Sequence, residues 1–94
     1  MHKYLVKINI SNGGSLAYYE LHQVMTGLGF AQSLPDADGN DFVFSDATYI
    51  CSDNGVADVC DIKNKIENAM GRRFELSIFV CCFTNYLVMP FTRN

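Results

Sequence analysis

Residues 74–91 read FELSIFVCCFTNYLVMPF, and this stretch decides the fold because it is the most apolar segment of the chain. β-Branched and aromatic residues dominate its first half, a composition typical of a buried central strand. A membrane-spanning helix is disfavoured, because Glu75, Asn85 and Pro90 would need polar partners in lipid. We therefore predict a strand of about ten residues, a turn at Thr84–Asn85 and a second apolar piece.

The bulk composition places the protein among small globular domains. The chain has 94 residues, of which 49% are hydrophobic and 18% charged, and this balance excludes a disordered protein. A high apolar share on a small domain favours a homodimer, which would cover the excess apolar surface. The net charge of −3 and the pI of about 5.1 argue against a nonspecific nucleic-acid binder, since such proteins are usually basic.

The cysteines indicate a reducing compartment. They form no C-x-x-C pair and so fit no zinc pattern. Met1 is followed by a charged, strand-like segment without the apolar centre of a signal peptide, so we expect a cytoplasmic protein with free thiols. Cys81 and Cys82 are neighbours on the predicted strand and should point to opposite faces of the sheet.

The first third of the chain predicts a strand followed by a helix. The side chains of residues 2–10 alternate between two faces of a strand. One face is formed by Tyr4, Val6, Ile8 and Ile10, and the opposite face by Lys3, Leu5, Lys7 and Asn9. Ser11–Ser15 is a turn, with Ser15 as the expected helix N-cap. Leu16–Leu28 carries an apolar stripe at helical spacing, and Gly29 is the expected C′ residue with Phe30 folded back on the last turn.

The middle of the chain predicts two strands and a second helix. Phe30–Leu34 is a short strand candidate, and the following residues 35–40 have turn composition. Asp41–Ser52 alternates as a strand, with a bulge or break expected near Ser45–Asp46. Asp53 or Asn54 is the expected cap of a helix that ends at Gly71.

The order of elements is that of a ferredoxin-like βαββαβ sandwich in the α+β class. We expect residues 1–94 to form one such domain. The extra C-terminal, strand-like tail, residues 85–94, is expected to take part in dimerisation by adding a strand to a neighbouring sheet.

Two turns invite a ligand interpretation that their spacing does not support. The glycine-rich turn at Ser11–Ser15 follows neither G-x-G-x-x-G nor G-K-[ST], so a plain connector is favoured over a phosphate loop. The turn at residues 35–40 resembles a calcium loop only loosely, because Gly39 is misplaced and no late glutamate follows. The residues that carry this resemblance are Asp36, Asp38, Asn40 and Asp41. No metal or cofactor is predicted.

His22 is the candidate catalytic residue. It lies on the polar face of the predicted helix, where an imidazole could act as a general base on a ribose 2′-hydroxyl. A solvated surface histidine is the alternative. The neighbouring Tyr18 and Tyr19 could stack on bases, or simply pack at the helix edge.

Three features of the first fifty residues resemble the GhoS antitoxin family. They are the tyrosine-led strand Tyr4–Asn9, the serine-rich turn after it, and the helix whose end, Met25–Phe30, has the pattern Met-x-x-x-x-Phe. The remainder matches in element order. The same fold and dimer plan occur in VapD ribonucleases and in the small CRISPR-associated integration subunit. Related enzymes carry an aspartate at the end of the first strand, where this chain has Asn9.

The resemblance implies a cytoplasmic antitoxin of a toxin–antitoxin pair, acting as an endoribonuclease on toxin messenger RNA. Single-stranded RNA would then be the partner, and the RNA-binding candidates are Lys3, Lys7, Asn9, Arg72 and Arg73. The alternative function is a non-catalytic homodimer that binds a protein partner, as an inhibitor or regulatory subunit, and a small-molecule-binding regulatory domain is a third. No membrane insertion is expected.

Overall fold

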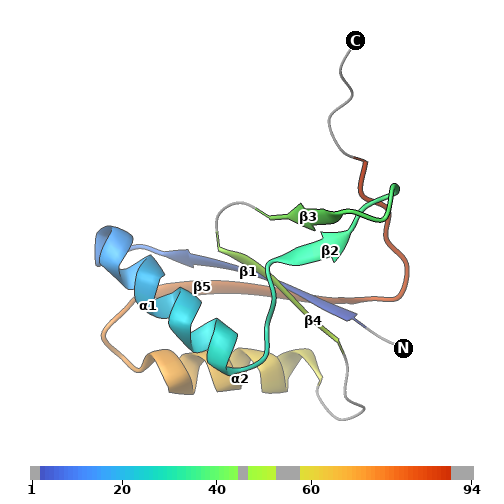
Figure 1. Ribbon diagram of the computed structural model, residues 1–94. Helices are drawn as coiled ribbons and strands as arrows, with labels where there is room; N and C mark the ends of the chain where they lie inside the picture. The colour runs from blue at the N-terminus through green and yellow to red at the C-terminus, as the bar shows by residue number, and fades with distance from the viewer. Residues whose placement is uncertain (1–2, 45–46, 53–57, 90–94) are drawn as a thin grey trace.

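The computed structural model describes residues 3–44, 47–52 and 58–89 as an α+β domain, which confirms the predicted class (Figure 1). The elements, in chain order, are β1 (Lys3–Ile10), α1 (Gly14–Gly27), β2 (Ser33–Pro35), β3 (Asp41–Val43), β4 (Thr48–Ser52), α2 (Val59–Met70) and β5 (Leu76–Phe83). The predicted break at Ser45–Asp46 and the predicted caps Asp53 and Asn54 lie outside the described residues.

The main sheet has three antiparallel strands in the order β4-β1-β5. The predicted alternation of β1 is confirmed, since Tyr4, Val6 and Ile8 are buried while Lys7 and Asn9 are exposed. The prediction that the apolar stretch supplies the central strand is wrong, because β1 takes the centre and β5 lies at the edge. Every β5 residue is consequently exposed or only partly buried.

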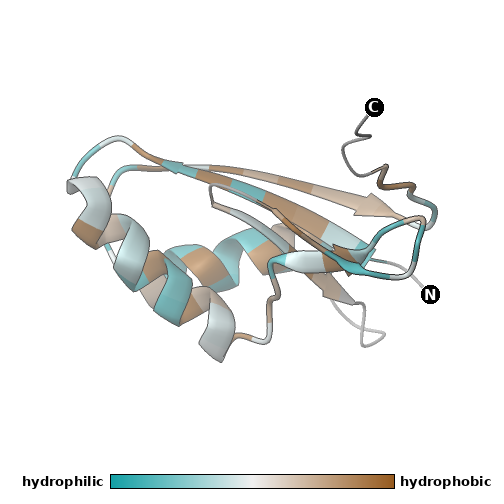
Figure 2. Ribbon diagram, turned by 45° about the horizontal axis from the view of Figure 1, so that its top comes forward, coloured by the Kyte–Doolittle hydropathy of each residue, from teal (hydrophilic) through white to brown (hydrophobic). Residues whose placement is uncertain are grey.

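Both helices cover the same face of this sheet, as Figures 1 and 2 show. Leu21 and Met25 of α1 and Ile62, Ile66 and Met70 of α2 share one buried cluster with the inward side chains of β1. The 3.6-residue period of a helix places these residues on a single stripe, and they form the core that the sequence pattern predicts. The predicted stripe member Leu28 lies outside it and is exposed.

The ends of α1 differ from the prediction at one terminus. The N-cap is Gly13, with φ at 94° and no side-chain cap, and not Ser15, which lies inside the helix. At the other end Gly29 donates to the carbonyl oxygen of Thr26 (3.1 Å) and Phe30 to that of Met25 (2.9 Å), the Schellman pattern. The predicted helix stop at Gly29 and the return of Phe30 to the core are confirmed.

Helix α2 begins later than its predicted caps. Asp58 is the N-cap, and its side chain accepts a hydrogen bond from the backbone N–H of Asp61 (2.8 Å). Gly71 ends the helix with a positive φ of 73°, as predicted.

The segment between α1 and β4 departs from the predicted short strand over residues 30–34 and from the predicted longer strand over residues 41–52. β2 and β3 form a separate hairpin closed by Asp36, whose side chain accepts hydrogen bonds from the backbone N–H groups of Asp38 and Asn40. An isolated bridge, Ala31 to Ile50, is the contact of this segment with β4 among the described residues. The hairpin pairs three residues of each strand, and no fourth strand joins the main sheet in the described part of the chain.

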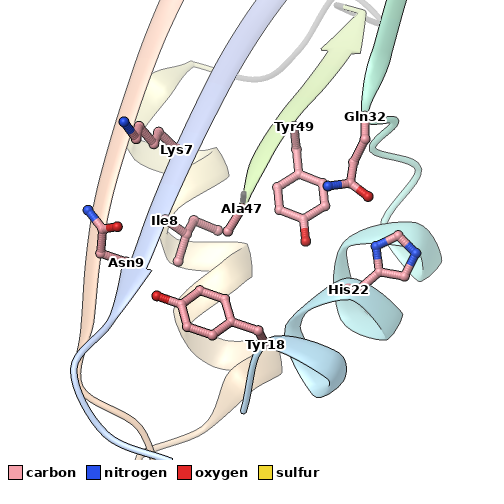
Figure 3. A pocket seen from close by; sticks show the side chains of 8 residues that line it. All are labelled: Lys7, Ile8, Asn9, Tyr18, His22, Gln32, Ala47 and Tyr49. Atoms are coloured by element: carbon pink, nitrogen blue, oxygen red, sulfur yellow. The ribbon is translucent and has the colours of Figure 1, made fainter. Parts of the chain in front are cut away.

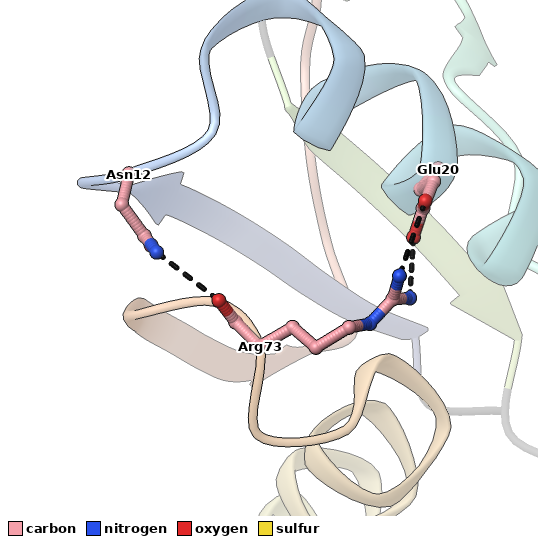
Figure 4. Close-up of polar contacts among 3 residues, drawn as sticks. All are labelled: Asn12, Glu20 and Arg73. Atoms are coloured by element: carbon pink, nitrogen blue, oxygen red, sulfur yellow. Dashed lines mark hydrogen bonds and ion pairs between the residues drawn. The ribbon is translucent and has the colours of Figure 1, made fainter.

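The glycine-rich turn after β1 is tied to the turn before β5. The Asn12 side chain donates to the carbonyl oxygen of Arg73 (3.1 Å) and accepts from the backbone N–H of Glu75, and the Ser11 hydroxyl donates to the Glu75 carboxylate (2.7 Å) (Figure 4). These polar groups are occupied by protein partners, which favours the predicted connector over a phosphate loop.

The described part of the tail, residues 84–89, is irregular and folds back on its own chain. The carbonyl oxygen of Val88 accepts from the backbone N–H of Ala37 in the β2–β3 turn (3.0 Å), and the Tyr86 ring meets Phe83 edge to face. Figure 1 shows this segment beside the hairpin. Dimerisation through the tail therefore stays a prediction.

Candidate functional site

An open pocket of about 470 Å³ lies between α1 and the sheet, at one edge of β1 (Figure 3). Its lining gathers residues from four segments of the chain: Lys7, Ile8, Asn9, Tyr18, His22, Gln32, Ala47 and Tyr49. Three of the predicted site residues, His22, Lys7 and Asn9, are therefore among its lining residues.

The pocket exists because β4 covers only part of the edge of β1. The register ends with Lys7 opposite Thr48, and one further hydrogen bond joins the Ile8 N–H to the Ala47 carbonyl (2.9 Å). Beyond it, the Tyr18 hydroxyl accepts from the Ile10 N–H (2.9 Å). A side chain of α1 thus satisfies a backbone group that would otherwise be unpaired at this edge.

Two aromatic rings and an amide surround the open centre of the pocket. The His22 and Tyr49 ring centroids are 6.4 Å apart, and Figure 3 shows the Gln32 amide directed between these two residues. Burial raises the pKa of the Tyr49 hydroxyl, so it is a neutral hydrogen-bond donor around neutral pH. The pocket thus offers an imidazole on its exposed rim and, from the buried Tyr49, a neutral hydroxyl that can donate a hydrogen bond.

Lys7 and Asn9 reach the pocket as part of the strand, while their side chains belong to the other side of the sheet. Figure 3 shows both directed away from Tyr18 and Tyr49. Alternation along β1 requires this, because Ile8 between them points toward the helices and is buried. The strand edge therefore separates the His22 side from a polar surface that carries Lys7 and Asn9.

The remaining predicted RNA-binding residues lie elsewhere. Lys3 is partly buried at the far end of β1, about 13 Å along the strand from Lys7. Arg72 lines a separate cavity of about 560 Å³ beside the end of α2. Arg73 forms an ion pair with Glu20 (2.7 Å) and lies over the Phe74 ring, 5.1 Å from its centroid (Figure 4). The structure thus brings two of the five candidates to the His22 pocket.

The polar lining residues Gln32 and Tyr49 were not singled out by the sequence, whereas Tyr18 was named only as a possible base-stacking ring. Tyr18 precedes His22 by one helical turn, so the i, i+4 relation could have placed both on one face. Gln32 and Tyr49 come together through the Ala31–Ile50 bridge, a long-range contact with no local signature. No hydrophobic period or motif could have indicated them.

Residues 3–44, 47–52 and 58–89 contain no cluster of three or more His, Cys, Asp or Glu side chains arranged for a metal ion. None of the four cysteines forms a disulfide, and the β1–β5 register places Cys81 and Cys82 on opposite faces, as predicted. Neither α1 nor α2, the helices of this described part, has the length and apolar character needed to cross a bilayer.

No protein-family model, curated protein or solved structure matches this chain. Functional proposals therefore depend on the sequence resemblance and on the geometry of the pocket and surfaces.

Proposed function

We propose that the protein is a GhoS-like antitoxin with endoribonuclease activity on single-stranded RNA, in which His22 acts as general base. The observation that carries this proposal is the pocket that places His22 beside the Tyr49 hydroxyl, with Lys7 and Asn9 on the strand that forms its wall. The imidazole would remove the proton of a ribose 2′-hydroxyl, whose oxygen then attacks the adjacent phosphorus. The P–O5′ bond breaks as the new bond forms, which gives a 2′,3′-cyclic phosphate, and the departing 5′-oxygen takes a proton from solvent water.

A ferredoxin-like arrangement of the domain is part of the same proposal. It is supported by the split β4–α2–β5 unit, in which β1 lies between two strands connected through a helix. The Ala31–Ile50 bridge lies on the outer side of β4, where the missing strand of the ferredoxin-like sheet would pair.

The free edge of β1 suggests how RNA would lie. A strand of RNA that crosses this edge would place a ribose beside His22 and an adjoining phosphate near Lys7 on the opposite side. Tyr18 would provide an apolar ring beside the base, although its hydroxyl is already bonded to Ile10. One lysine contact gives a weak electrostatic contribution, so binding should be weak and should fall only shallowly with salt, with a log–log slope of about −0.7.

Cleavage of a panel of single-stranded RNAs by the purified protein tests the catalytic role of His22. We expect His22→Ala to lower the cleavage rate by about 10²–10⁴-fold, the usual contribution of a general base. The matched control is Gln23→Ala, the next residue on α1, which is also exposed and lies outside the pocket lining. It should cut at the rate of the native protein.

The same assay has informative negative outcomes. Cutting that is lost in EDTA but retained by His22→Ala would assign the chemistry to a carboxylate-bound metal and contradict the proposal. No cutting under any condition would remove the endoribonuclease and leave the second candidate.

The second candidate is a homodimeric protein-interaction or inhibitor module. It is favoured by large apolar side chains that the described chain leaves in solvent, among them Phe79 at 59%, Met89 at 67% and Leu87 at 74% exposure. Exposed apolar surface on a small domain is typical of an interaction site. The net charge of −3 agrees better with a protein partner than with RNA.

Sedimentation equilibrium of the native chain over a wide range of concentration tests the homodimer. We expect twice the mass of one chain to accumulate as concentration rises. A constant mass of 10.5 kDa throughout would contradict self-association.

A further inference from the structure

The outer edge of β5 presents a row of backbone groups without a strand partner in the described part of the chain. The N–H groups of Ile8 and Ile10 point away from β5, toward Ala47 and Tyr18. In an antiparallel ladder successive residues alternate their bonding direction, so the odd-numbered residues of β1 bond to β5. The hydrogen bond from the Ser11 N–H to the Glu75 carbonyl likewise joins two odd-numbered residues.

The register then fixes which β5 residues face outward. Each odd-numbered residue of β1 is opposite an odd-numbered residue of β5, as in the pair Lys7 and Phe79. The outward N–H and C=O groups therefore belong to the even-numbered residues Leu76, Ile78, Val80 and Cys82. The odd-numbered residues of β5 thus bond to β1, and its even-numbered residues remain available to bond to a second strand.

This edge lacks the usual protection against pairing. The sequence of β5 is LSIFVCCF, eight residues without a charge, proline or glycine. Edge strands normally carry such residues, or are covered, because an exposed ladder recruits another strand. The edge of β5 is long and uncharged and carries the exposed ring of Phe79, and these properties allow another strand to pair with it.

We propose that this edge pairs with β5 of a second copy of the chain, antiparallel and about a two-fold axis through Phe79, to form a continuous six-stranded sheet. The proposal rests on the homodimer of the second candidate function and is independent of RNA cleavage. An antiparallel strand is self-complementary about such an axis, as an isologous dimer requires. In this register odd-numbered residues lie opposite odd-numbered residues, so their side chains point to the same face of the joined sheet. The helices of both copies therefore lie on one face.

The two-fold axis through Phe79 pairs Ile78 of one copy with Val80 of the other through their outward backbone groups. Phe79 then faces its own symmetry mate at a non-hydrogen-bonded position, where Cα atoms lie about 4.5 Å apart and side chains make close contact. Aromatic cross-strand pairs at such positions stabilise sheets. The axis thus covers Phe79, the large apolar side chain that β5 leaves exposed.

Charge also permits a second copy here, although the chain is acidic overall. In this register Glu75 is opposite Phe83 of the second copy. The two Glu75 carboxylates are eight positions apart along the paired strands, about 26 Å at 3.3 Å per residue. That distance exceeds the Debye length of about 8 Å at physiological salt, so the like charges do not oppose pairing.

Disulfide trapping tests the pairing and its register. The proposed axis places Ser77 opposite Cys81 of the second copy, also at a non-hydrogen-bonded position within the Cα range of a disulfide. In a background with Cys60→Ser and Cys82→Ser, we expect Ser77→Cys to give a covalent dimer on mild oxidation, with peptide mapping that links positions 77 and 81. Asn64→Cys, on the exposed surface of α2, is the control for random collision.

A link between Phe79→Cys and Cys81 of the second copy, without a dimer from Ser77→Cys, would place the axis at Val80 and overturn the proposed register. Yields no higher than that of Asn64→Cys, in a protein that sediments as a dimer, would overturn the β5 interface while leaving the homodimer intact.

A charge at the axis gives a second, non-covalent test. Phe79→Lys would place two like charges face to face, and we expect the dimer dissociation constant to rise at least about tenfold. Val43→Lys is matched, because Val43 is 67% exposed on β3 and lies away from the edge. It should leave the constant unchanged, and circular dichroism should confirm that both variants fold.

Truncation after Thr84 separates this interface from the predicted tail interface. A truncated chain that remains dimeric supports β5 pairing, because Leu76–Phe83 is intact. A folded but monomeric truncated chain would overturn it in favour of the tail.

Discussion

Leu21→Ala is expected to lower the free energy of unfolding by about 2–5 kcal/mol, as large-to-small core substitutions do. Leu21 is completely buried in α1 and belongs to the cluster that joins both helices to β1. Removing its side chain loses apolar burial and leaves a cavity that rigid neighbours fill only in part. Since small domains are stable by about 5–15 kcal/mol, the loss is a large fraction of the total.

Leu16→Ala is the matched control, because Leu16 is the same residue type on the same helix and is 70% exposed. Its effect should stay within about 0.5 kcal/mol. Urea denaturation followed by circular dichroism measures both variants. Equal destabilisation of the two would contradict the packing of α1 against the sheet.

Gly13→Ala is expected to destabilise the fold by about 2–4 kcal/mol through two additive causes. The backbone of Gly13 has φ at +94°, a conformation that side chains rarely adopt. An added Cβ would also lie 2.8 Å from the Cβ of Ala17 and 3.0 Å from the Phe74 ring. The turn therefore needs glycine both for its backbone angle and for the close approach of Phe74.

Gly14→Ala separates these two causes, because Gly14 also has a positive φ, of 59°, but its Cβ would meet nothing within 4 Å. We expect it to cost about 1–2 kcal/mol, the backbone strain alone. Thermal unfolding of both variants gives the comparison. A Gly13→Ala effect no larger than that of Gly14→Ala would show that the contact with Ala17 and Phe74 relaxes freely.

The elements that the sequence predicted well are those with a local physical cause. The two-residue period of β1 and the stripe through Leu21 and Met25 report which side of each element faces the core. Gly29 and Gly71 stop the helices because each takes a positive φ. The candidate base His22 could likewise be placed on the polar side of its helix from spacing alone.

The elements that the sequence predicted poorly depend on partners far along the chain. The apolar composition of β5 indicated a central strand, yet a composition cannot say which strand has neighbours on both sides. The strand predicted over residues 41–52 is divided into β3 and β4, because the two parts pair with different strands, β3 with β2 and β4 with β1. The N-cap is a glycine, Gly13, at a point where Phe74 comes too close for a side chain to fit. Phe74 is 61 positions away in the sequence.

By itself the sequence determined the α+β class, the inward and outward faces of β1, the helix stops and the location of His22 on a polar surface. These follow from periodicity and from the backbone preferences of single residues. Only the tertiary structure decided the strand order, the assembly of Gln32 and Tyr49 beside His22 and the free edge of β5. Each of these depends on long-range pairing, which juxtaposes segments whose local patterns carry no information about one another.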